Sequence, residues 1–112
     1  MTDPEIVIAA AEARGWRYGS QPSGQDARII CWNDAQGQYA ARYDWNPLEN
    51  EADFWSLVDL LRSDGFQVFI EIDDKRTFVQ VWQPKKAPFH AYDSDRRRAI
   101  VLTYLRAKGT RI

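Results

Sequence analysis

The sequence has very few of the residues on which disulfide frameworks and many catalytic sites depend. Among its 112 residues there is one cysteine, Cys31, and one histidine, His90. A single cysteine excludes an internal disulfide and is typical of proteins of a reducing cytoplasm. A single histidine excludes a histidine-rich metal site, since it supplies at most one ligand. We expect Cys31 to be a buried, inert thiol and His90 to be a loop residue outside any catalytic set.

Long apolar segments and phosphate-binding loops are also missing. The longest apolar run, Ile6 to Ala11, is too short to cross a membrane. No charged segment followed by an apolar one comes after Met1, so we expect no secretory signal. The glycine patterns of mononucleotide- and dinucleotide-binding loops are absent. Asp73–Asp74 and the pair Asp93 and Asp95 lack the spacing of a calcium loop, so we expect neither a metal nor a cofactor.

The composition that remains is that of one globular domain rich in aromatic residues. Hydrophobic residues make up 45% and charged residues 28% of the chain, which is ordinary globular usage. A chain of this length holds a single core, so we expect one domain over residues 1–112. Five Trp, five Tyr and five Phe are many for 112 residues. The net charge of −1 excludes a generally basic, nucleic-acid-coating protein.

The charge is unevenly distributed along the chain. Residues 1–82 hold 14 acidic and 7 basic side chains, whereas residues 83–112 hold 2 acidic and 8 basic ones. A chain with two such poles either folds them together or presents two faces of opposite sign to partners. Both possibilities stay open at the level of the sequence.

Local patterns predict an α+β fold. Asp3–Pro4–Glu5 is a helix start that Asp3 would cap, and Gly15 is a helix stop. Phe54, Leu57, Val58 and Leu61 form one helical stripe, after Asn50 as the cap and before Gly65 as the stop. Period-two alternation predicts strands over 66–72 and 77–82. Further expectations are strands at 28–33 and 38–43, an extended piece at 16–18, loops at 19–27 and 83–92, and a last helix capped by Asp93 or Ser94 that runs to Lys108.

These elements follow one another as helix, hairpin, helix, hairpin, helix. Hairpins pair antiparallel, so we predict one four-stranded antiparallel sheet, made from two hairpins and packed by three helices. Several short motifs accompany this order: Gly15–Trp16, the stretch from Tyr43 to Trp55, the stretch from Leu60 to Val68, and Arg98–Ala99–Ile100. Together with the order of elements, they resemble the phage ABA sandwich family of small phage and prophage proteins. The resemblance implies a phage or prophage origin and an accessory role, and it brings no catalytic residues.

The first candidate site is an acidic edge of the central helix. Trp55 and Asp59 lie four residues apart and share one edge of that helix, beside the apolar stripe. An indole flanked by carboxylates combines an apolar anchor with a charge that attracts a basic partner. The predicted partner-binding residues are Trp45, Glu49, Glu51, Asp53, Trp55 and Asp59. The other interpretation of Trp55 is that it packs under the loop over 43–48.

Two further features have both a functional and a structural interpretation. Arg96, Arg97 and Arg98 open the last helix, where cations oppose the helix dipole. They form either an anion-binding site or ion pairs with the acidic part of the chain. Phe69, Phe78 and Trp82 are placed to share one face of the second hairpin. That face either stacks nucleic-acid bases or is covered by a helix, as a three-layer sandwich requires.

We therefore expect a non-enzymatic phage or prophage protein of the bacterial cytoplasm that acts by binding another protein. The resemblance favours an inhibitor of host antiviral defence, such as an anti-CRISPR protein. Its acidic segment over 44–59 would dock on the basic nucleic-acid groove of a host defence complex and exclude the substrate. The alternative is a nucleic-acid or nucleotide binding module that uses the sheet aromatics and the Arg96–Arg98 cluster. Carboxylate catalysis also stays open, because spatial pairing is invisible in a sequence.

Overall fold

The computed structural model of the protein describes residues 2–19, 30–33 and 45–110. Within them the chain is α+β. The elements in chain order are α1 (Asp3–Ala13), β1 (Trp16–Gly19), β2 (Ile30–Asn33), α2 (Glu51–Ser63), β3 (Gln67–Ile72), β4 (Thr77–Trp82), β5 (Phe89–Asp93) and α3 (Arg96–Ala107). The predicted loop over 19–27, apart from Gly19, and the predicted strand over 38–43 lie outside the described residues.

Each helix begins at a side chain that accepts a hydrogen bond from a free backbone N–H. Asn50 caps α2 as predicted, because its Oδ1 accepts from the Asp53 N–H at 3.1 Å. The other two caps differ from the prediction by one or two residues. Thr2 rather than Asp3 caps α1, and Asp95 caps α3 by accepting from the Arg97 N–H at 2.9 Å. Gly65, at φ +88°, ends α2 in the left-handed region that glycine adopts without strain.

Strands β3 and β4 form the predicted hairpin in a register that runs from Gln67 opposite Trp82 to Ile72 opposite Thr77. The turn between them is closed by Asp73, whose Oδ1 accepts from the N–H groups of Lys75 and Arg76 at 2.8 and 2.9 Å. The prediction of a loop over 83–92 is wrong at its end. There β5 pairs antiparallel with β4 and becomes the third strand of this sheet.

The four-stranded sheet is not seen in the described residues. Strand β2 pairs instead with β1, from Trp16 opposite Asn33 to Gly19 opposite Ile30, in a separate two-stranded sheet. The extended piece predicted at 16–18 is thereby confirmed as a strand. The physical reason is that periodicity identifies strands but not the partners with which they pair.

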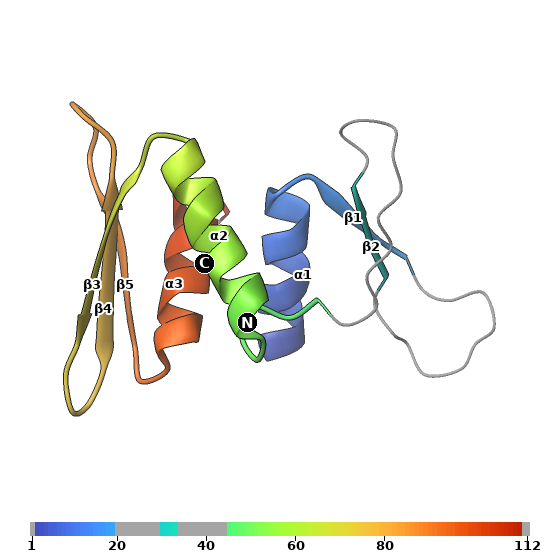
Figure 1. Ribbon diagram of the computed structural model, residues 1–112, viewed down its shortest axis with the longest axis horizontal. Helices are drawn as coiled ribbons and strands as arrows, with labels where there is room; N and C mark the ends of the chain where they lie inside the picture. Colours follow the sequence, from blue (N-terminus) through green and yellow to red (C-terminus); the bar gives the residue numbers. More distant parts are fainter. Residues whose placement is uncertain (1, 20–29, 34–44, 111–112) are drawn as a thin grey trace.

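The elements stack in layers (Figure 1). The three-stranded sheet β3–β4–β5 lies at one end, α2 and α3 pack against one of its faces, α1 follows, and the β1–β2 pair lies beyond α1. Helix α3 is the middle of this stack, since it contacts strands β4 and β5 of the sheet and both other helices. Its sequence accordingly lacks a single apolar stripe, and buried residues surround it: Ala99, Ile100, Val101, Thr103, Tyr104 and Leu105.

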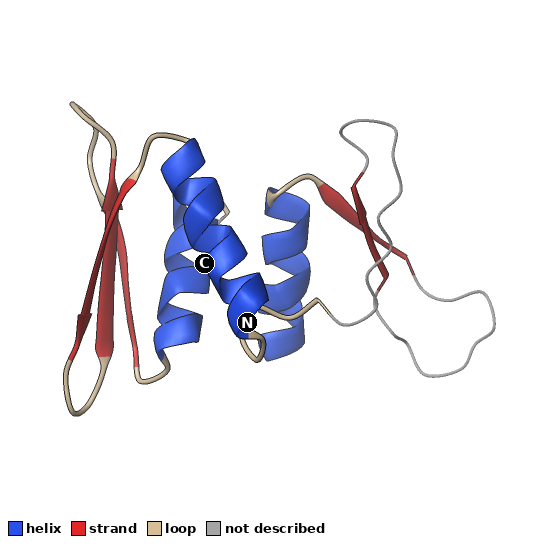
Figure 2. Ribbon diagram, viewed as in Figure 1, coloured by secondary structure: helices blue, strands red, loops and turns tan. Residues whose placement is uncertain are grey.

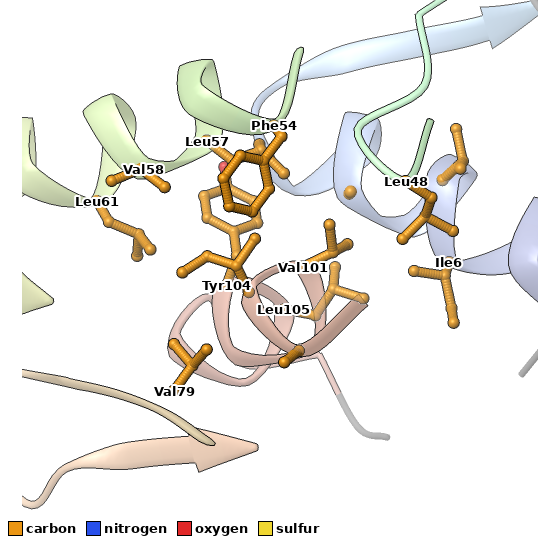
Figure 3. Close-up of a cluster of buried hydrophobic side chains, with 14 of the residues drawn as sticks. Ile6, Leu48, Phe54, Leu57, Val58, Leu61, Val79, Val101, Tyr104 and Leu105 are labelled. Atoms are coloured by element: carbon orange, nitrogen blue, oxygen red, sulfur yellow. The ribbon is translucent and has the colours of Figure 1, made fainter. Parts of the chain in front are cut away.

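The core lies between α3 and the elements on either side of it (Figure 3). Phe54, Leu57, Val58 and Leu61 of α2 point toward Tyr104 of α3, as the helical stripe predicts. Leu57 and Leu61 are fully buried. A fully buried leucine contributes roughly 1.5–3 kcal/mol to the free energy of folding. On the other side of α3, Val79 of β4 closes the core against the sheet.

Candidate functional site

Two of the predicted partner-binding residues are part of the core rather than of the surface. The side chain of Asp53 is 2% exposed and that of Trp45 is 4% exposed. Asp53 is held there because its Oδ2 accepts from the Asn46 N–H at 2.9 Å, which fixes the chain as it enters α2. The Trp45 ring packs edge-on against Trp16, with 5.3 Å between ring centroids. The prediction that these two residues belong to an exposed patch is therefore wrong.

Glu51, a third member of the predicted patch, joins α2 to α3. Its Oε1 accepts from the Nε of Arg97 at 3.0 Å and from the guanidinium nitrogens of both Arg96 and Arg97. The hydrogen bond from Arg97 and the charges of Arg96 and Arg97 hold the pKa of Glu51 below its ordinary value, against the opposing effect of desolvation. Arg97 also donates to the Glu49 carbonyl at 3.0 Å. The acidic and basic poles of the chain thus meet at this point.

The third arginine of the cluster is also engaged with carboxylates. Arg98 forms ion pairs with Asp3 at the start of α1 and with Asp93 at the end of β5, the latter at 3.2 Å. Each of the three arginines therefore has a carboxylate partner within the chain. The contacts favour the structural interpretation of the cluster, which is internal ion pairing. The anion-binding interpretation requires arginines without a carboxylate partner, and each of these three has one.

What remains of the acidic edge is Glu49, Trp55 and Asp59, which are all exposed. The Trp55 side chain is 48% exposed and packs edge-on against Phe54, with 5.0 Å between ring centroids, so it does not lie under the preceding loop. It borders an open groove of about 410 Å³ between α2 and β3. Val58, Arg62, Phe66, Gln67, Val68 and Ile70 line the rest of this groove.

A second candidate site is the face of the sheet that points away from the helices. All three helices lie on the other side of β3–β4–β5 (Figure 2). The register and alternation place Val68, Ile70, Val79, Val81 and Ala91 toward the helices. None of the described helices covers the opposite side, here called the open face. The open face consists of Gln67, Phe69, Glu71, Phe78, Gln80, Trp82, His90 and Tyr92.

Aromatic rings on the open face contact one another across the strands. Phe78 on the central strand is 4.7 Å from Tyr92, 6.0 Å from His90 and 6.3 Å from Phe69, measured between ring centroids. Phe69 is 44% and Tyr92 50% exposed. Because Phe78 packs against three neighbouring rings, these contacts restrict the side chains before any partner arrives, and less side-chain entropy is lost on binding.

Charge on the open face is sparse. Glu71 is the one carboxylate among its strand positions, and none of those positions holds Lys or Arg. At one end of the sheet the Arg76 guanidinium lies over the Tyr92 ring, 4.5 Å from its centroid. Beside it, the backbone hydrogen bonds from Lys75 and Arg76 lower the pKa of Asp73. Lys85 and Lys86 lie in the loop between β4 and β5, at the other end.

The expectation of a shared aromatic surface for Phe69, Phe78 and Trp82 is confirmed by the strand register. Sequence reasoning missed His90 and Tyr92 because it assigned residues 83–92 to a loop. The signal was present as a short alternation from Phe89 to Asp93, directly after Pro88. The alternation was weak because Ala91, which faces the helices in the middle of β5, is a small residue and gives little hydrophobic signal.

The described residues contain no group of three His, Cys, Asp or Glu side chains able to hold a metal ion. None of the helices in that part of the chain has the length and apolarity needed to span a bilayer. Cys31 lies on β2, as the sequence predicts.

Comparison with protein-family models, with curated proteins and with solved structures finds no match to this chain. The resemblance to phage ABA sandwich proteins stays a prediction.

Proposed function

We propose that this protein is a non-enzymatic binding protein that recognises a partner protein through the open face of its three-stranded sheet. The observation that carries this proposal is that the half-buried ring of Phe78 packs against the exposed rings of Phe69 and Tyr92 on either side of it. Aromatic residues are enriched and charged residues are depleted at the centres of protein–protein interfaces. Rigid Tyr, Trp and Arg side chains supply most of the binding energy there.

The distribution of charge favours a protein over a polyanion as the partner. A nucleic acid is bound mainly through phosphates, which need Lys or Arg beside the stacked bases. The open face offers none at its strand positions, and the arginines at the start of α3 are engaged with Glu51, Asp3 and Asp93. A weakly charged protein surface needs no such cations, so it fits the open face better.

The biological role that we propose is the one that the family resemblance implies. It is an accessory role for a phage or prophage in the cytoplasm of a bacterial host, such as inhibition of an antiviral defence complex. The resemblance alone supports this part of the proposal. The binding surface differs from the one predicted by the sequence, because the open face replaces the acidic edge of α2.

The experiment that tests this proposal compares the open face with the exposed edge of α2, whose aromatic side chains are exposed to a similar extent. The double variant Phe69→Ser/Tyr92→Ser removes the exposed rings of the open face, and Trp55→Ala removes an exposed ring of α2. Each variant and the wild type serve as bait in bacterial lysate, and a protein captured by the wild type is then purified for affinity measurement. We expect the double variant to weaken binding by about tenfold or more and Trp55→Ala to leave it unchanged.

Circular dichroism establishes that both variants are folded before binding is compared. If Trp55→Ala abolishes capture while the double variant still binds, the surface is the edge of α2 and the open-face proposal is wrong. If no protein binds at all, the proposal is overturned as well.

Nucleic-acid binding is the second candidate, because five rings spread over three adjacent strands resemble a base-stacking platform. Its test is direct titration with fluorescent single-stranded oligonucleotides at low salt. Stacking of each base contributes roughly 1–3 kcal/mol. Affinity that falls in the Phe69→Ser/Tyr92→Ser variant and decreases steeply with salt would assign the open face to a nucleic acid instead.

A further inference from the structure

The outer edge of β3 is an unprotected strand edge. In the part of the chain that the structure describes, β3 pairs with β4 alone. Every second residue of an edge strand points its backbone N–H and C=O away from the sheet, where they pair readily with another strand. The sequence of β3, Gln-Val-Phe-Ile-Glu-Ile, contains none of the lysines, prolines or bulges with which proteins block such edges.

The opposite edge of the same sheet carries the protection that β3 lacks. Strand β5 is preceded by Pro88, which has no N–H to donate. The carbonyl of its residue His90 accepts a hydrogen bond from the Arg106 guanidinium, so part of its backbone is already engaged. The contrast between the two edges leaves β3, and not β5, as the edge that is open to pairing with another chain.

Apolar side chains gather around the bare edge. Of the five large hydrophobic residues that are exposed in the described part of the chain, Trp55, Phe69 and Ile72 lie on or beside β3, and Ile72 is 63% exposed. Ile72 points to the helix side, next to the groove of about 410 Å³ that Trp55, Val68 and Ile70 help to line. Helix α2 contacts β3 but leaves an open groove beside it, so a strand added at this edge would cover apolar side chains that are still exposed.

We propose that β3 pairs antiparallel with β3 of a second copy of this chain, which joins the two sheets into one of six strands. A two-fold axis perpendicular to the sheet keeps both sets of helices on one side and both open faces on the other. In this arrangement, two residues that lie opposite each other in the two copies of β3 must point their side chains to the same face of the joined sheet. Two registers satisfy this over most of the strand, one centred on Phe69 opposite Phe69 and one centred on Ile70 opposite Ile70.

The charges of β3 agree with pairing to a copy of itself. Glu71 is the one charged residue of the strand. It lies opposite Gln67 in the first register and opposite Phe69 in the second, so the two copies place no like charges against each other. On the helix side, Val68, Ile70 and Ile72 of one copy lie beside the same residues of the other and extend the apolar wall of each groove. The dimer also makes the two open faces continuous.

The experiment measures the molar mass of the purified protein by sedimentation equilibrium from about 1 µM to about 500 µM. Ile72→Lys places a cation beside the proposed interface at an exposed position, and Tyr92→Lys places one at an exposed position on the opposite edge strand. Circular dichroism checks the fold of both. We expect dimers for the wild type and for Tyr92→Lys, and an increase of at least tenfold in the dissociation constant for Ile72→Lys.

Hydrogen exchange of the wild type gives a second measurement that needs no variant. The amides of residues 67–72 should exchange at least several-fold more slowly at the concentration where the dimer forms than at the lowest concentration. A wild type that stays a monomer at every concentration overturns the proposal. So does a dimer that Tyr92→Lys disrupts while Ile72→Lys does not, which would mean that the open faces stack on each other. Partner capture by the open face is measured separately, so the two proposals can fail independently.

Discussion

Asp53 shows at the scale of one residue why an acidic side chain in a sequence need not be a surface charge. It lies in the first turn of α2, where a carboxylate is favoured by the helix dipole. The side chain turns back toward the preceding loop and accepts the Asn46 N–H, and in doing so becomes buried. Charge reversal at Asp53 would therefore disturb the start of α2 rather than probe a binding surface.

At Leu57 the expected effect of a substitution is large, because the side chain is fully buried between α2 and α3. Leu57→Ala should lower the free energy of unfolding by roughly 2–5 kcal/mol, since the lost transfer energy and the remaining cavity add. Urea-induced unfolding followed by circular dichroism measures this. Leu60→Ala is the matched control, because Leu60 is only partly buried on the same helix. A loss below about half a kcal/mol at Leu57 would place that side chain outside the core.

Helices α1 and α2 differ in what they bury, although both are capped and of similar length. The buried side of α1 consists of Ile6 and Val7 with two alanines, Ala10 and Ala11. Helix α2 buries Phe54, Leu57, Val58 and Leu61, which present much more apolar area for each turn. Because hydrophobic stabilisation scales with buried apolar area, α1 is held more weakly against α3 than α2 is.

We therefore expect α1 to open before α2. In native-state hydrogen exchange, the amides of residues 3–14 should have lower opening free energies than those of residues 53–63. Mass spectrometry of exchanged peptides from the two helices measures both in one sample. Equal or greater protection of α1 would show that its contacts with α3 and β1 outweigh its small side chains.

For the whole molecule, the two charged poles neutralise each other through contacts between distant parts of the chain. Arg97 and Glu51 are 46 residues apart in the sequence and are joined by the hydrogen bond from the Arg97 Nε. Arg98 likewise connects α3 to Asp3. These ion pairs between the acidic and the basic part of the chain join the starts of α1, α2 and α3.

This arrangement predicts how stability depends on pH. The pKa of Glu51 is lowered from its ordinary value of 4.5, chiefly by the hydrogen bond from Arg97. A carboxyl whose pKa is lower in the folded state stabilises the fold above its unfolded pKa and loses that contribution as the pH falls through the folded value. The thermal midpoint should hence fall as the pH drops below about 4.5, and it should fall less steeply in Glu51→Gln.

Differential scanning calorimetry between pH 7 and pH 3 measures both slopes. Asp73 contributes in the same direction, since its pKa is lowered from 3.8 by two backbone N–H groups. For this reason some pH dependence should remain in the Glu51→Gln variant. Identical slopes for the variant and the wild type would mean that the pairing with Arg96 and Arg97 has no energetic effect.

The sequence by itself determined the features that depend on neighbouring residues. The stripe from Phe54 to Leu61 and its limits at Asn50 and Gly65 predict α2 correctly, because a helix is made of contacts three and four residues apart. The alternation on either side of residues 73–76 predicts the β3–β4 hairpin in the same way. Phe69, Phe78 and Trp82 of the open face were therefore visible before the structure, whereas His90 and Tyr92 were not.

Only the tertiary structure decided which surfaces are covered and which charges are paired. Strand β5 exists because β4 offers it an edge, and β1 pairs with β2 although the sequence favours another partner. The burial of Asp53 and Trp45, the pairing of Glu51 with Arg97 and the exposure of the open face each depend on where distant elements lie. Residue patterns encode local geometry through fixed spacings, whereas burial and pairing depend on how the helices and sheets pack together.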